Sequence, residues 1–198
     1  MPARLAVTLI ALACILTGPA CRHTGPATTP PDAARPGPFE PDRKIWTLDP
    51  FRNPRTWRVE SWANPATATV QDRTLVIRVQ GGRLDKSAVS RPIMLDMSSR
   101  SQIRLSARNE SEEPVRIAIA ISTGPKNVYY ESVPIPLEPG AETELAFSLV
   151  ESNFKSAKSH WKQNGAIAGL DAVKRLFILV YSVRPGTITI DALSAIQN

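Results

Sequence analysis

The chain is poor in the side chains on which most enzyme sites depend. Its 198 residues include two cysteines and two histidines, and residues 45–198 contain one histidine, His160, and no cysteine. A zinc site of the usual cysteine and histidine kind therefore lacks its ligands. A serine triad would depend on His160, and no G-x-S-x-G turn exists to present its nucleophile. A glycine-rich phosphate-binding motif is also absent.

Carboxylates are the remaining candidates for catalysis. Asp85, Asp96, Glu131 and Asp171 are available as the paired acids of a glycosidase. No run of the form E-x-D-x-x-E, which would set several acids on one strand, is present. Such side chains commonly serve as caps, turn residues and surface charges. The sequence therefore predicts a protein that is not an enzyme, with a small glycan-active enzyme as an alternative.

Basic charge is present but not concentrated. The net charge is +6, yet Lys and Arg are scattered along the chain and form no block. A basic surface attracts nucleic acid, an anionic membrane or an acidic polysaccharide. Because no basic run occurs, we predict no nucleic-acid partner. Lys155, Lys158 and Lys162 would share one face of a helical turn, which is either solvated or able to meet an acidic glycan.

No hydrophobic run is long enough to cross a membrane as a helix. Residues 5–16 are uncharged and almost wholly apolar, but about twelve residues fall short of the ~20 that a bilayer requires. With Arg4 before it, this stretch has the form of a secretory signal. Residues 1–20 are therefore interpreted as a signal peptide.

Cysteine usage indicates how the mature chain begins. Residues 17–21 read TGPAC, which resembles a bacterial lipobox, although Gly18 stands where leucine is usual. The resemblance implies that Cys21 becomes a lipidated, palmitate-bearing N-terminus and anchors a lipoprotein to a membrane of the bacterial cell envelope. Cys14 would be lost with the signal, so this lone cysteine would have a function. The alternative is ordinary cleavage after Ala20 and a secreted or periplasmic soluble protein.

Proline separates the signal from the body of the protein. Six prolines interrupt residues 22–41, and such a stretch favours extended conformations that do not pack. Residues 21–44 are therefore interpreted as the lipidated N-terminus and a linker. Residues 45–198 are the predicted folded domain, and its stability must come from its core because no disulfide is possible there.

Hydrophobic residues in this domain alternate with polar ones, as in half-buried antiparallel strands. The alternating segments are residues 74–80, 102–108, 115–122, 144–149 and 187–196. Residues 175–183 are apolar on both faces, which predicts a central strand covered on both sides. Ala118 and Ala120 are small and can floor a shallow groove. Only residues 151–162 and 168–174 favour short helical turns, so we predict an all-β fold, an antiparallel β-sandwich or jelly roll.

The order of motifs in the C-terminal half resembles a known family. Tyr130-Glu131-Ser132 is followed by PGAETELAFSL at 139–149, Phe154, Trp161, LDAVKRLFILVYS at 170–182 and GTITIDALSAI at 186–196. This order resembles the jelly-roll carbohydrate-binding modules of the galactose-binding-domain-like fold, over about residues 45–196. The resemblance implies a saccharide held on one sheet by flat aromatic faces, with polar groups fixing the hydroxyls.

The candidate ligand-binding residues follow from that expectation. They are Tyr129, Tyr130, Glu131, Arg91 and Trp161, and the further aromatic candidates are Trp57, Trp62 and Tyr181. Because Tyr129 and Tyr130 are adjacent on a strand, one of them must point away from the core. Each of these side chains can instead serve the core or a cross-strand ion pair.

A structural calcium ion is a further expectation, since modules of this fold often hold one between the first and last strands. Asp49 and Asp191 are its candidate ligands, and the alternative is that Asp191 bonds the backbone at a bulge. The predicted function is a surface-tethered, non-catalytic domain that binds a poly- or oligosaccharide. The alternative is a structural or protein-interaction lipoprotein domain whose partner is a cell-envelope protein.

Overall fold

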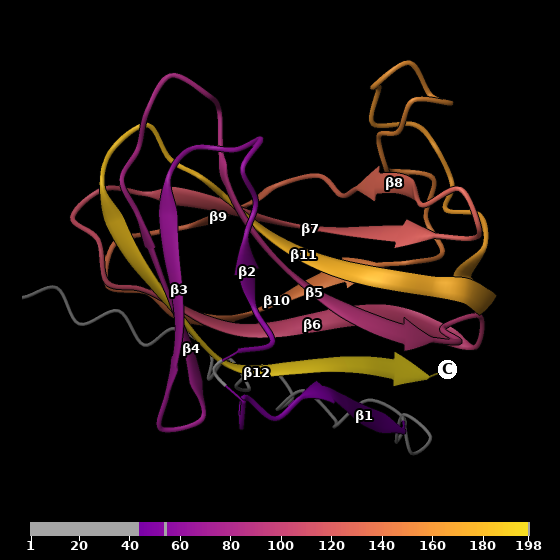
Figure 1. The fold of residues 1–198 in the computed structure, drawn as a ribbon, viewed down its shortest axis with the longest axis horizontal. Helices are drawn as coiled ribbons and strands as arrows, with labels where there is room; N and C mark the ends of the chain where they lie inside the picture. The colour runs from indigo at the N-terminus through magenta and orange to yellow at the C-terminus, as the bar shows by residue number, and fades with distance from the viewer. Residues whose placement is uncertain (1–43, 54, 198) are drawn as a thin grey trace, which may run out of the picture. The chain divides into compact units, whose positions relative to one another are not determined.

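Alternation along the chain produces two antiparallel sheets that pack face to face (Figure 1). This computed structural model describes residues 44–53 and 55–197, all within one unit that comprises residues 40–198. The predicted all-β sandwich is confirmed. The signal peptide, Cys21 and the linker up to residue 43 lie outside the described residues and stay predictions. Within the described part, no helix has the length and apolar character that a membrane crossing requires.

Within residues 44–53 and 55–197, each sheet has six strands. Sheet A has the order β10 (Glu142–Ser148), β6 (Arg100–Asn109), β12 (Gly186–Gln197), β4 (Thr74–Val79) and β3 (Ala66–Gln71), and β1 (Ile45–Asp49) also pairs with β12. Sheet B has the order β2 (Arg58–Val59), β5 (Ser87–Leu95), β11 (Val173–Tyr181), β7 (Val115–Thr123) and β8 (Val128–Glu131), and β9 (Ile135–Leu137) pairs with β7. A 3₁₀ turn, η1 (Leu170–Ala172), precedes β11.

The core lies between the sheets because every second residue of each strand points there. Ile117, Ile119 and Ile121 of β7 are completely buried and belong to the same cluster as Leu105 of β6 and Ile188 of β12. Burying one such side chain stabilises the fold by about 1.5–3 kcal/mol. The many that meet here explain how the domain stands without a disulfide.

Sheet B is also apolar on its outer face. Phe177, Leu179 and Tyr181 of β11 form a second, separate cluster with Ala118 and Ala120 of β7. Strand β11 is therefore central and covered on both sides, as its sequence predicted. Ala118 and Ala120, predicted as the floor of a shallow groove, are completely buried within this cluster instead.

At residues 151–162, where short helical turns were predicted, no helix forms, although backbone i→i+3 hydrogen bonds close turns within 156–162. This segment is irregular, and within it Lys155 pairs with Glu131 as an isolated bridge on the edge of β8. Ser156 and Ser159 exchange side-chain bonds with each other's backbone amides, which compete with helical hydrogen bonds. The predicted basic helical face therefore does not exist. At residues 168–174 only the three-residue turn η1 forms before β11 begins.

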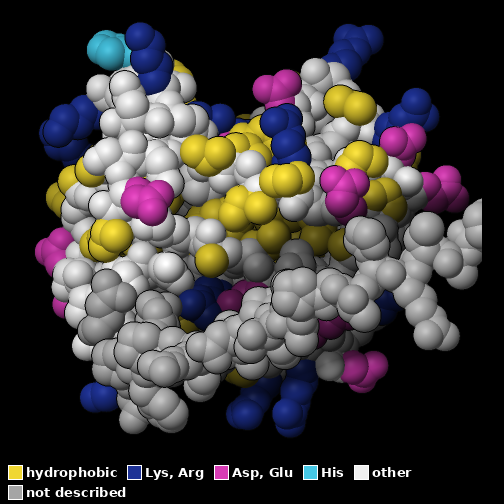
Figure 2. All heavy atoms as spheres, turned by 180° about the vertical axis from the view of Figure 1, so that it is seen from behind, with side chains coloured by type: hydrophobic (Ala, Val, Ile, Leu, Met, Phe, Trp, Pro, Cys, Tyr) yellow, Lys and Arg dark blue, Asp and Glu magenta, His cyan; other side chains and the backbone are white. Residues whose placement is uncertain are grey.

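The surface mixes apolar and charged side chains. On the face in Figure 2, hydrophobic side chains gather across the middle, and Lys and Arg side chains stand apart from one another around them. The scattered basic residues of the sequence thus form no single basic patch on this face. Among the large exposed apolar side chains of the described residues are three tryptophans: Trp46 and Trp161, each 58% exposed, and Trp62, 46% exposed.

Candidate functional site

Strand register brings residues from four strands into one row on the outer face of sheet B. Phe177 of β11 lies opposite Ser90 of β5 and Ala120 of β7, and Ala120 lies opposite Glu131 of β8. A second row runs beside it through Arg175, Ser122 and Tyr129. The two rows form a floor in which two aromatics, one acid and one base lie near small side chains.

Loops raise walls around this floor. The connection from β2 to β3 supplies Glu60 and Trp62, the residue before β5 is Lys86, and the irregular segment after β10 supplies Trp161. Together with Tyr129, Glu131, Arg175 and Phe177, these four residues enclose a hollow of about 410 Å³, the sheet B hollow. Its size is suited to a small ligand or to part of a polymer chain.

Asn64 fastens two of the loops to each other. Its amide donates to the Leu84 carbonyl at 2.6 Å and accepts from the Leu84 amide at 3.0 Å. Its own backbone N–H donates to the Lys86 carbonyl at 2.9 Å. Because Asn64 is buried, these bonds hold Lys86 and Trp62 on the same side of the sheet.

Four aromatic rings line the hollow, with Tyr129 among them. Its ring centroid is 5.4 Å from Phe177, 6.2 Å from Trp62 and 6.3 Å from Trp161. The contacts to Phe177 and Trp62 are edge-on, which is a favoured aromatic geometry. The two tryptophans are about half exposed, so part of each indole remains open to a ligand.

The backbone of Trp161 is also unusual. Both His160 and Trp161 have positive φ angles, 52° and 61°, which non-glycine residues seldom adopt. Such a conformation costs on the order of 1–3 kcal/mol and occurs both in turns and at functional sites. It follows a turn in which the Trp161 amide donates to the Ser156 carbonyl at 2.9 Å.

Glu131 is the polar centre beneath the rings. The residue is completely buried, and each carboxylate oxygen meets one ammonium: Lys86 at 2.5 Å and Lys155 at 2.7 Å. The hydroxyls of Tyr129 and Tyr181 donate to the same carboxylate, the former at 2.8 Å. Two ammonium groups and two hydroxyls therefore surround a single acid.

These contacts set the ionisation of the group. Burial alone would raise the pKa of Glu131, but the hydrogen bonds from Lys155, Lys86 and Tyr181 outweigh it and hold the pKa below its usual value. Burial and the charge of Glu131 raise the pKa values of Tyr129 and Tyr181 far above that of an ordinary tyrosine. Both hydroxyls therefore stay protonated and act as donors to the carboxylate.

Glu60 occupies the opposite wall and orients Trp62. Its Oε2 accepts the indole N–H of Trp62 at 3.0 Å. Its Oε1 accepts the hydroxyl of Ser90 at 2.5 Å and faces an Arg175 guanidinium nitrogen at 3.3 Å. The exposed indole is thus held by a hydrogen bond rather than by burial.

Three of the five predicted ligand-binding residues meet here. Tyr129, Glu131 and Trp161 all line the sheet B hollow. Tyr130 follows Tyr129 on β8, so strand alternation turns it to the opposite side of the sheet. Its side chain is buried in the core between the sheets. Arg91 does not line the hollow either, because its guanidinium forms an ion pair with Asp49.

The two predicted calcium ligands lie in different settings. Asp49 is buried: its Oδ1 accepts the Phe51 amide and its Oδ2 accepts the Trp57 indole N–H, both at 2.8 Å. Asp191 is exposed at the β-bulge where β12 shifts register against β6. Among the described residues, no group of three or more His, Cys, Asp or Glu side chains is placed to hold a metal ion. The calcium site stays a prediction.

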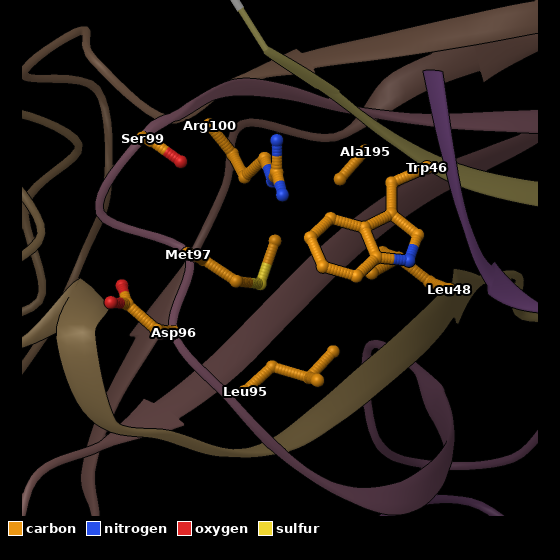
Figure 3. A pocket seen from close by; sticks show the side chains of 8 residues that line it. All are labelled: Trp46, Leu48, Leu95, Asp96, Met97, Ser99, Arg100 and Ala195. Carbon is orange, nitrogen blue, oxygen red and sulfur yellow. The ribbon is translucent and has the colours of Figure 1, made fainter. Parts of the chain in front are cut away.

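A second hollow, of about 330 Å³, opens beside β1 (Figure 3). Trp46 forms one side, and the Arg100 guanidinium lies 4.3 Å from the centroid of its ring. The Met97 side chain points toward the same space, whereas Asp96 points away from it. The Arg100 guanidinium is already bonded to Gln197 at 2.7 Å. This β1 hollow therefore has an exposed indole but few free polar groups.

Several residues of the sheet B hollow were not predicted from the sequence. Glu60 and Lys86 carry no motif, Arg175 and Phe177 lie in the segment 170–182 but were not named as site residues, and Trp62 was one of several aromatic candidates. The signal that could have found Phe177 and Arg175 is their position on the strand apolar on both faces, since one of its faces had to lie outside the sandwich.

Comparison with known proteins gives structural matches only. No protein-family model and no curated protein matches the chain. A family 11 carbohydrate-binding module from Clostridium thermocellum, in complex with a β-1,3-1,4-mixed-linked tetrasaccharide, is 10% identical with a TM-score of 0.57, and the match covers 76% of this chain and 94% of that one. The solution structure of CtCBM11 is 11% identical with a TM-score of 0.59, over 78% and 95% of the two chains.

An agarase also matches, at 14% identity and a TM-score of 0.57 over 78% of this chain. The match covers only 24% of the agarase, so the chain spans about a quarter of that enzyme's length. Likeness at such low identity establishes the fold alone. The domain is therefore an all-β sandwich structurally similar to carbohydrate-binding modules.

Proposed function

We propose that this domain is a non-catalytic saccharide-binding domain whose site is the sheet B hollow. The observation that carries the proposal is the pair of half-exposed tryptophans, Trp62 and Trp161, set against Tyr129 over a floor of fixed polar groups. Flat aromatic faces contact the C–H faces of sugar rings, and neighbouring polar groups select the hydroxyls. The Clostridium thermocellum module, of similar fold and described with a bound tetrasaccharide, supports this proposal.

The test is affinity electrophoresis of the protein through gels that contain a panel of neutral and acidic polysaccharides. Retardation by one of them should be lost in Trp62→Ala and Trp161→Ala variants, each weakening binding about tenfold or more, which corresponds to about 1.4 kcal/mol. Trp46→Ala is the matched control, because Trp46 is as exposed as Trp161 but lies in the β1 hollow. No retardation by any polysaccharide, or retardation unaltered in both variants, would contradict the proposal.

A protein partner is the alternative function. Trp46 and Leu95, which line the β1 hollow, are exposed large apolar side chains, and exposed apolar surface often docks another protein. In that case Trp46→Ala, rather than Trp62→Ala, would abolish association with a cell-envelope protein in crosslinking experiments.

We propose further that the domain is exported and tethered to a membrane of the cell envelope through lipid on Cys21. The support is the sequence of residues 1–21 and the lone cysteine that remains after cleavage. A Cys21→Ser variant should leave the membrane fraction and stay soluble. If it remains in that fraction unchanged, the anchor is not Cys21.

A further inference from the structure

The two acids of the sheet B hollow have little acceptor capacity left for a ligand. Glu131 already receives Lys86, Lys155 and the hydroxyls of Tyr129 and Tyr181. Four donors match the roughly four lone-pair positions of a carboxylate.

Glu60 is engaged in the same way. It receives Ser90, Trp62 and Arg175, so three donors occupy its two oxygens. Saccharide hydroxyls that need an acceptor therefore find little here.

The bases of the hollow are in the opposite situation. The Arg175 guanidinium has five N–H donors, and the structure gives it one weak bond, to Glu60 at 3.3 Å. Its side chain is 46% exposed and lines the hollow. Lys86 has three donors, of which Glu131 and the Tyr181 hydroxyl take two, the latter at 3.2 Å. Within the described part of the chain, the hollow thus offers donors in excess.

Charge has the same imbalance. Four bases lie at or near the hollow, namely Lys86, Lys155, Arg175 and Arg116, the last 5.4 Å from the ring centroid of Tyr181. Three acids oppose them, namely Glu60, Glu131 and Asp85, whose charge acts on Lys86 and Tyr181. Burial lowers the pKa of Lys86, and Glu131, which it shares with Lys155, restores only part of the difference. A second anion beside Lys86 would compensate this charge.

We infer that the sheet B hollow selects a saccharide that carries an anionic group, a carboxylate or a sulfate ester, bound by Arg175 and Lys86 while the aromatic rings hold the sugar. This inference rests on the proposed saccharide-binding function. Arg175 suits the anion because its planar fork can pair with two oxygens at once. Lys86 lies deeper and adds a point charge below the rings, 6.0 Å from the centroid of Trp62.

Titration calorimetry with three galactose-based oligosaccharides of equal length tests the inference: one neutral, one with uronic acid units and one sulfated. We expect at least one anionic oligosaccharide to bind tenfold or more tightly than the neutral one at low salt, with the preference shrinking as salt is added. The uronate and sulfate arms identify which anion is selected.

Variants locate the preference. Arg175→Gln should reduce it strongly while weak binding of the neutral oligosaccharide persists, and Lys86→Gln should act similarly, with Lys86→Arg restoring part of it. Arg104→Gln is the control, because Arg104 is a partly exposed base paired with Glu144 on sheet A. Melting curves establish that each variant is folded, and Arg175→Gln alone suffices if Lys86→Gln unfolds.

The outcomes separate the two proposals. If the neutral oligosaccharide binds as tightly as both anionic ones, or if the preference survives in Arg175→Gln and Lys86→Gln, the anionic selectivity is refuted and saccharide binding stands. If none of the three binds, and no polysaccharide retards the protein, both proposals are refuted.

Discussion

At the scale of single residues, Glu131 shows how a buried acid can be kept ionised on the outer face of a sheet. Removing a charge from water is costly unless the charge is paired and hydrogen-bonded. Here Lys86 and Lys155 supply the pairing, and Tyr129 and Tyr181 supply the remaining bonds. The same contacts fix the position of Tyr129 in the hollow, so stability and the site share one network.

Replacing that acid should therefore be strongly destabilising. Glu131→Gln removes the charge that Lys86 and Lys155 share, and we expect a loss of about 3–5 kcal/mol in the free energy of unfolding. Glu144→Gln is the control, because Glu144 pairs with Arg104 on the exposed face of sheet A and should cost less than about 1 kcal/mol. Urea unfolding followed by circular dichroism measures both. Equal losses of unfolding free energy in the two variants would mean that the network around Glu131 stabilises the fold no more than an exposed ion pair does.

The lowered pKa of Glu131 predicts a pH dependence with a definite sign. Because its folded-state pKa lies below the ordinary value of 4.5, its contribution to stability is present above that value and is lost as the pH falls through the folded-state pKa. The wild-type protein should therefore lose more stability between about pH 7 and about pH 3 than Glu131→Gln does. Parallel melting-temperature profiles of the two proteins would argue against an ionised, stabilising Glu131.

At the scale of strands and loops, strands were predicted correctly where apolar and polar residues alternate along the chain. They were not predicted where strand register or loop conformation determines the structure. The segments that became β4, β6, β7, β10, β11 and β12 were predicted within a few residues. Strand β5 was not, because Pro92 interrupts it and prolines are depleted from strands. It is tolerated here because β2 pairs only with Val89 and Ser90, which leaves Pro92 beyond the end of that neighbour.

The same distinction applies to the residues of the candidate site. Tyr129, Glu131 and Trp161 were named as candidates from the sequence, and all three line the hollow. Phe177 and Arg175 meet Tyr129 only through the pairing of three strands, and no local pattern encodes that pairing. The choice between Tyr129 and Tyr130 likewise needed the sheet, since alternation fixes that the two diverge but not which of them faces outward.

Gly81 lies in the connection from β4 to β5, and its substitution tests how the loops of the hollow are held in place. It has φ +68°, and a Cβ there would lie 2.5 Å from the Val183 carbonyl oxygen, a backbone atom that cannot easily yield. Gly81→Ala should cost about 2 kcal/mol or more, from the positive φ and from the clash. Gly124 has nearly the same φ, +64°, and open space around it, so Gly124→Ala should cost only about 1 kcal/mol. Similar losses in thermal unfolding would show that the clash is relieved elsewhere.

At the scale of the whole molecule, the two hydrophobic clusters have different roles. The larger one between the sheets holds the sandwich together, and the smaller one on the outer face of sheet B supports the hollow. Substitutions in the first should reduce stability, and substitutions of exposed residues above the second should reduce binding with little loss of stability. A domain arranged in this way can change its ligand through its loops while the sandwich stays the same.

The contact between Asp49 and Arg91 allows this division to be tested, because it joins β1 of sheet A to β5 of sheet B away from the hollow. Asp49 also accepts the Trp57 indole N–H, so Asp49→Ala leaves Arg91 without its partner and should cost about 3–5 kcal/mol of unfolding free energy. Polysaccharide binding, measured below the lowered melting temperature, should be unchanged. If binding falls in parallel with stability, the hollow depends on the ion pair between Asp49 and Arg91. If added calcium raises the melting temperature of the wild type but not of Asp49→Ala, Asp49 acts as a metal ligand rather than as the partner of Arg91.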